Sequence, residues 1–157
     1  MKIRYLDGRR LRRSLVAGCD FVQQQRAELN RINVFPVPDG DTGTNLALTA
    51  SAIADRLRNS KETKAGAVAE LAADAAILGA RGNCGMILSH FLLGFSEKVR
   101  SKRRLTTTEF SMALQGGVDH VYNALEKPVE GTIITVMRAT AEAANEKPEA
   151  DFNALLE

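Results

Sequence analysis

The chain has 157 residues, of which 45% are hydrophobic and 25% charged, and its net charge is +2. This length and balance are typical of one globular domain with a buried core, and the near-neutral charge favours no particular partner. The sequence shows no apolar run of signal-peptide or transmembrane length, so we expect no membrane span. Tryptophan is absent and aromatic residues make up 5%, which predicts an aliphatic core.

The two cysteines and the two basic clusters are interpreted without a functional role. The cysteines Cys19 and Cys84 are far apart and lack metal-like spacing, which predicts reduced thiols in a cytoplasmic protein. The basic clusters at 9–13 and 100–104 lack interleaved stacking aromatics. We therefore expect solvated helix ends and no binding of nucleic acid.

Apolar residues recur at three- and four-residue steps, which predicts helices along most of the chain. Thr106 and Glu109 have the spacing of a capping box, Pro148 is expected to end a helix, and Asp151 can cap another. The expected helices cover roughly 10–29, 46–57, 68–78, 86–94, 110–125, 132–144 and 151–157. No strand pattern of useful length appears. The fold class expected is therefore all-α, an antiparallel bundle of about seven helices in one domain over 1–157.

The run from Asn33 to Asn45 contains an Asp-Gly-Asp turn just before a predicted helix. Its two prolines forbid a helix, and its glycines permit a sharp turn and close approach of a ligand. Asp39 and Asp41 can converge on a hard cation, while amides of the new helix face an anion. A metal beside a phosphate site is one interpretation; an ordinary surface turn is the other.

Two more helix starts share this glycine-bearing character, at 79–85 and 130–132. In an up-and-down bundle the second, fourth and sixth helices begin at the same end, so the three starts meet at one rim. Together they predict a phosphate-binding site without a Walker loop, since no Gly-x-x-x-x-Gly-Lys-Ser/Thr occurs. Flexible connections between helices are the alternative. His90 and His120 are expected to lie away from this rim, and Cys84 to make a small polar contact there.

Taken together, the three motifs resemble the DAK2 (DhaL-like) domain over roughly 10–145. Within that family they are most similar to the N-terminal ATP-binding domain of bacterial fatty acid kinase. The resemblance implies a barrel of antiparallel helices with ATP at one rim and Mg²⁺ held by aspartates. It implies that Asp39 and Asp41 are catalytic metal ligands, with the neutral Asn33 where some relatives carry a third aspartate. The residues implied to bind the nucleotide are Thr42, Gly43, Thr44, Asn45, Gly82, Asn83, Cys84, Gly85 and Thr132.

The function implied is transfer of the γ-phosphoryl group of ATP to a fatty acid carboxylate held by a separate acyl-binding protein. Three alternatives remain: the nucleotide-binding component of a dihydroxyacetone (glycerone) kinase, a phosphatase, and a non-catalytic nucleotide-binding module. Relatives carry a further C-terminal segment that closes the nucleotide site. We therefore expect this chain to be a truncated domain that is inactive alone and able to form a homodimer through its exposed seam.

Overall fold

The computed structural model describes residues 2–146 and 151–157, and in them the chain is mostly helical, as predicted. The elements are β1 (Leu6–Asp7), α1 (Gly8–Gln24), α2 (Arg26–Ile32), α3 (Thr42–Arg58), α4 (Ala65–Gly79), α5 (Gly82–Val99), β2 (Arg104–Leu105), α6 (Thr107–Ala124), α7 (Ile133–Glu146) and α8 (Phe152–Leu156). The two strands form one short antiparallel pair in which Leu6 lies opposite Leu105. The expected all-α class is confirmed.

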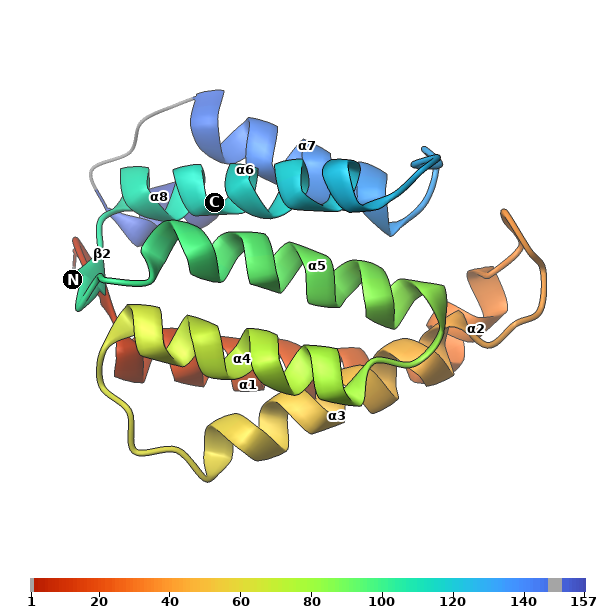
Figure 1. Ribbon diagram of the computed structural model, residues 1–157, viewed down its shortest axis with the longest axis horizontal. Helices are drawn as coiled ribbons and strands as arrows, with labels where there is room; N and C mark the ends of the chain where they lie inside the picture. The colour runs from red at the N-terminus through yellow and green to blue at the C-terminus, as the bar shows by residue number, and fades with distance from the viewer. Residues whose placement is uncertain (1, 147–150) are drawn as a thin grey trace.

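The helix expected over 10–29 is divided in two. Gln25 ends α1, its amide donating to the carbonyl of Phe21 at 3.0 Å, and it also precedes α2. Periodicity alone missed the division because Leu29 keeps the apolar spacing across it. The break lets α2 leave the direction of α1 and lie at the far end of the bundle (Figure 1).

Two predicted helix caps are confirmed. In the capping box of α6, Thr106 Oγ1 accepts from the amide of Glu109 at 3.2 Å, and Glu109 Oε2 accepts from the amide of Thr106 at 2.9 Å. Asp151 caps α8 by accepting from the amides of Asn153 and Ala154. The helix end expected at Pro148 lies outside the described residues.

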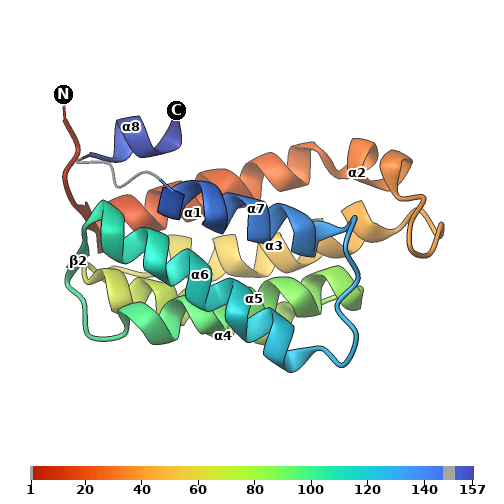
Figure 2. The same ribbon diagram turned by 90° about the horizontal axis from the view of Figure 1, so that it is seen from above.

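Close packing of small side chains holds the long helices together. The alanines of α4 are buried against α3 and α5, with Ala72 and Ala76 both fully covered. Between α5 and α6, a Cβ added at Gly94 would lie 2.4 Å from the carbonyl oxygen of Gly116, so the two backbones touch. Figures 1 and 2 show the resulting up-and-down arrangement, in which α3, α5 and α7 all begin at one end of the bundle. No helix in the described part of the chain is long and apolar enough to cross a membrane.

Candidate functional site

A cavity of about 870 Å³ opens at the end of the bundle where α3, α5 and α7 begin. All three predicted helix starts contribute to its wall, so the structure brings them together as the helix order required. The predicted site residues that line it are Asn33, Asp39, Asp41, Thr42, Asn45, Gly82, Asn83, Cys84 and Thr132.

Three predicted nucleotide-binding residues lie behind this wall. A Cβ at Gly43 would sit 2.2 Å from the carbonyl oxygen of Arg26, and one at Gly85 would sit 2.4 Å from Thr49 Oγ1. Thr44 Oγ1 accepts from the side chain of Arg26 at 3.2 Å. These residues support the wall by packing α3 against its neighbours, and their contact with phosphate stays a prediction.

Asparagines, rather than aspartates, cap the start of α3. Asn33 Oδ1 accepts from the amide of Thr42 at 3.2 Å, and Asn30 Oδ1 accepts from the amide of Thr44 at 2.9 Å. Asp41 occupies the N-cap position but makes no side-chain cap bond. The Asn33 oxygen therefore has one lone pair engaged, and a metal could use only the other. The carboxylate of Asp41 stays available for a ligand.

Asp39 and Asp41 are both exposed at the mouth of the cavity. Within the described residues, the one hydrogen bond to either carboxylate is that of the Asp41 amide to Asp39 Oδ1, at 3.5 Å. Among the described residues, no histidine, no cysteine and no further acidic side chain joins this pair to complete a metal cluster. Mg²⁺ commonly takes only one or two carboxylates, with phosphate oxygens and waters as its other ligands. The pair fits Mg²⁺ bound together with a phosphate ligand.

The start of α5 is fixed to α3 by a buried hydroxyl. Thr49 Oγ1, which has no exposed surface, accepts from the Arg81 amide at 3.1 Å and donates to the Asn45 carbonyl at 2.9 Å. Gly82 follows with φ +62°, and an added Cβ would lie 2.6 Å from Asn45 Nδ2. Only glycine fits this turn without strain, and its bare backbone faces the cavity.

Cys84 makes the small polar contact that the sequence suggested. Its thiol donates to the carbonyl of Thr42 at 3.5 Å and so joins the first turns of α5 and α3. Burial raises the pKa of the Cys84 thiol, and the negative charges of Asp41 and Asp39 raise it further. The thiol is therefore protonated at neutral pH and is a poor nucleophile.

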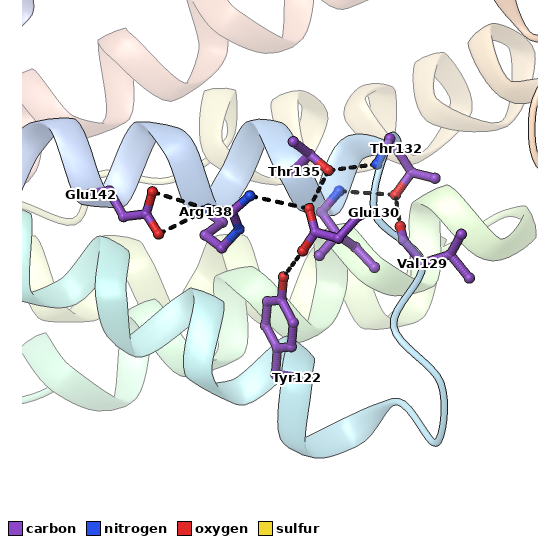
Figure 3. A network of polar contacts seen from close by, with 9 residues as sticks. Tyr122, Val129, Glu130, Thr132, Thr135, Arg138 and Glu142 are labelled. Carbon is purple, nitrogen blue, oxygen red and sulfur yellow. Dashed lines mark hydrogen bonds and ion pairs between the residues drawn. The ribbon is translucent and has the colours of Figure 1, made fainter.

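A carboxylate network holds the third helix start (Figure 3). Glu130 accepts from the hydroxyls of Tyr122 and Thr135, and it pairs with Arg138 at 3.3 Å. These donors lower the pKa of Glu130 to about 2, with Thr135 as the largest cause, followed by Tyr122. Thr135 Oγ1 also accepts from the Gly131 amide at 2.7 Å. The network ties α6 and α7 to the turn that lines the cavity.

Sequence reasoning missed this network, although it singled out the motif. The pairing of Arg138 with Glu142, at 3.0 Å, is visible as an i,i+4 spacing. The contribution of Tyr122 is not visible, because it comes from the preceding helix. Thr132 is held more locally: its hydroxyl donates to the Val129 carbonyl at 2.7 Å and accepts from the Ile134 amide at 3.3 Å.

Comparisons with known proteins identify the family. Residues 36–157 match the model of the DAK2 domain. The chain belongs to the DAK2 domain family. It is 41% identical over 158 residues to Protein YloV of Bacillus subtilis, an alignment covering 99% of this chain and 29% of YloV. It is 36% identical to an uncharacterized protein of Staphylococcus saprophyticus and 34% identical to one of Staphylococcus aureus, covering 92% and 90% of this chain and 26% of each relative.

This DAK2 domain therefore spans less than a third of the length of these curated relatives. Members of the family belong to kinase-related proteins, and DhaL-like domains are nucleotide-binding modules. The coarse expectation from the motifs, a DAK2 domain with a nucleotide-binding character, is thereby supported.

The other side of the cavity is apolar, which the sequence analysis did not anticipate. Its exposed hydrophobic side chains come from the 32–37 segment, from α5, from the turn before α7 and from α7 itself. They are Ile32, Phe35, Val37, Met86, Val129 and Val136. A site that joins a polar rim to such a wall suits a ligand with a charged group and an apolar body.

The two histidines lie elsewhere, as expected. His90 and His120 face each other between α5 and α6, with ring centroids 5.4 Å apart, and neither lines the cavity. Cys19 and Cys84 are both free thiols.

Proposed function

We propose that this DAK2 domain binds Mg-ATP and is the phosphotransferase domain of a fatty acid kinase. In this proposal the γ-phosphoryl group passes to a fatty acid carboxylate held by a separate acyl-binding protein. The observation that carries it is the joining of three helix starts and two carboxylates in one cavity, where neither carboxylate forms an ion pair with a described residue.

The helix starts supply the phosphate site. Amides in a first helical turn lack helical acceptors, and the helix dipole adds positive potential there. In α3 the amides of Thr42 and Thr44 are already bonded to Asn33 and Asn30, so α3 contributes mainly its dipole. Gly82 and Gly131 both have positive φ and line the cavity, so two of the turns present backbone without a side chain in the way. Cys84 and Thr132 hold these turns through bonds to neighbouring backbone.

Asp39 and Asp41 would hold Mg²⁺ at the mouth of this site. Bound Mg²⁺ neutralises phosphate charge and helps orient the γ-phosphoryl group for in-line transfer. The apolar wall gives the adenine ring or the acyl chain a surface away from water. The metal and phosphates would thus occupy the charged rim of the cavity, and the apolar part of a ligand would occupy its apolar side.

A carboxylate acceptor suits this lining better than a hydroxyl. Among the described lining residues there is no histidine, and the two aspartates are assigned to the metal. A fatty acid carboxylate is already ionised at neutral pH and needs no general base, whereas the hydroxyl of dihydroxyacetone does. The carboxylate oxygen attacks the γ-phosphorus, the bond to the β-phosphate oxygen breaks, and an acyl phosphate and ADP result.

Calorimetric titration with Mg-ATP tests the binding step. Asp39→Asn and Asp41→Asn should each lose Mg²⁺-dependent affinity while keeping their helical circular dichroism. Asp74→Asn is the matched control, since Asp74 is an exposed carboxylate on α4 that does not line the cavity. Unchanged affinity in both cavity variants would remove the metal role.

A coupled ADP-release assay tests the acceptor. ADP release that requires both this domain within its whole protein and an acyl-loaded binding protein would support the fatty acid proposal. Release driven by dihydroxyacetone instead would favour the glycerone kinase type. Nucleotide binding without turnover on either acceptor would indicate a non-catalytic module. The homodimer and the cytoplasmic location stay predictions, which sedimentation and cell fractionation address.

A further inference from the structure

Three segments that are far apart in sequence meet at the end of the bundle opposite the cavity (Figure 1). Leu6 pairs with Leu105 across the short sheet, and the Gly8 amide donates to the Thr63 carbonyl at 3.0 Å. We call this the basic end. Its segments are 2–13, 60–66 and 100–105.

The basic end concentrates positive charge from all three segments. Its exposed cations include Arg4, Arg9, Arg13, Lys61, Arg100 and Arg103. In sequence they form separate clusters, and only the fold brings the segments that carry them to one end of the bundle. Like charges within about a Debye length, roughly 8–10 Å, repel one another and destabilise the compact state.

The acidic side chains within these three segments are engaged by backbone amides. Asp7 accepts from the Arg10 amide at 2.9 Å, and Glu62 accepts from the two backbone amides that follow it. The one ion pair at the basic end, among the described residues, joins Lys102 to Glu109 at 2.8 Å. Within the described part of the chain, the six exposed cations named above form no ion pair.

Helix-end stabilisation does not account for the cluster. A cation near a helix C-terminus is favourable, which explains Arg100 after α5. Arg9 and Arg10, however, lie in the first turn of α1, which carries no acidic residue, and Lys64 is the N-cap of α4. There the helix dipole opposes a positive charge. Arg10 donates from its guanidinium to the Tyr5 carbonyl at 3.2 Å, but solvated helix ends, the interpretation drawn from the sequence, do not explain Arg9 and Lys64.

We propose that the basic end docks on an anionic lipid surface. Clusters of lysine and arginine are attracted to acidic headgroups, and apolar side chains beside them can enter the interface. Leu156, on α8, is 75% exposed. The Phe152 amide donates to the Ile3 carbonyl at 2.8 Å and holds α8 beside the N-terminal segment (Figure 2). The cavity opens at the opposite end, so a docked domain keeps it accessible.

The same surface lacks the features of a single-strand nucleic-acid reader. Such proteins stack bases on open aromatic rings along a basic groove. At the basic end, Tyr5 supplies the exposed aromatic ring among the described residues, and the Arg104 guanidinium covers it at 4.0 Å from the ring centroid. A planar anionic surface fits this end better than a polymer of nucleotides.

Vesicle co-sedimentation tests the proposal without any nucleotide, so its outcome is independent of the proposed kinase activity. The wild type should bind phosphatidylcholine vesicles that contain phosphatidylglycerol, and added salt should weaken binding. The test variant is Arg9→Gln/Lys61→Gln/Arg103→Gln, with one change in each segment. It should bind roughly a hundredfold more weakly, because each cation near an anionic surface contributes about fivefold. Its thermal stability should be unchanged or higher, since self-repulsion falls.

The matched control removes the same charge from the cavity end. Arg31→Gln/Arg81→Gln/Lys127→Gln should bind the anionic vesicles as the wild type does. Equal loss in this control would overturn the basic end as the docking surface. If the wild type binds pure phosphatidylcholine vesicles as tightly as those with phosphatidylglycerol, or binds neither, the anionic lipid is not the ligand of the basic end. So would a labelled RNA oligonucleotide that binds the basic end while anionic vesicles do not.

Discussion

The asparagines and the aspartates at the start of α3 have separable roles. Asn30 uses both ends of its amide there: Oδ1 accepts from the Thr44 amide at 2.9 Å, and Nδ2 donates to Thr44 Oγ1 at 3.0 Å. Asp41 makes no side-chain cap bond. Asn30→Ala therefore removes two hydrogen bonds within the protein, whereas Asp41→Asn removes no cap.

The magnitudes follow from this count. Each hydrogen bond of this kind contributes about 1 kcal/mol, so Asn30→Ala should lower the free energy of unfolding by about 2 kcal/mol. For a domain of this size that corresponds to a fall in Tm of about 4–8 °C. Asp41→Asn should change stability by less than about 0.5 kcal/mol, because lost interaction with the helix dipole is offset by relieved repulsion from Asp39.

Two measurements on each variant test the separation. Urea unfolding followed by far-ultraviolet circular dichroism should show the loss in Asn30→Ala alone. Titration with Mg-ATP, well below Tm, should show the larger loss of affinity in Asp41→Asn. If Asp41→Asn is destabilised as much as Asn30→Ala, then Asp41 caps α3 and the division of roles is wrong.

Three further predictions concern Glu130, two glycines and Cys84. The pKa of Glu130 in the folded state is lowered to about 2 from 4.5, so the stabilisation by its carboxylate is complete above pH 4.5 and is lost as pH falls towards 2. The difference in Tm between wild type and Glu130→Gln should therefore shrink over that range. A constant difference would contradict the network. Gly85→Ala should cost about 1–3 kcal/mol because its Cβ meets Thr49 Oγ1 at 2.4 Å, whereas Gly18→Ala, with nothing within 4 Å, should stabilise α1 by about 0.4–1 kcal/mol; equal effects in urea unfolding would refute the packing argument. The raised pKa of Cys84 predicts slow alkylation by iodoacetamide at neutral pH, and fast alkylation there would show a thiolate.

The sequence by itself determined the features that depend on neighbours along the chain. Helical periodicity, the capping box of Thr106 and Glu109, and the cap at Asp151 all arise from contacts within a few residues. The meeting of three helix starts also followed, because alternate helices of an up-and-down bundle begin at the same end. The first of those starts supplies Asp39, Asp41, Thr42 and Asn45 to the cavity lining.

Only the tertiary structure decided which groups meet across the bundle. The bond from the Arg81 amide to Thr49 joins residues 32 positions apart, and Asn33 rather than Asp41 caps the amide of Thr42. The union of the basic segments likewise needs the short sheet between β1 and β2. No local pattern encodes such pairs, since they form only when the helices pack and set the distances between residues remote in sequence. The packing of the helices places the three helix starts around one cavity and the three basic segments at the opposite end.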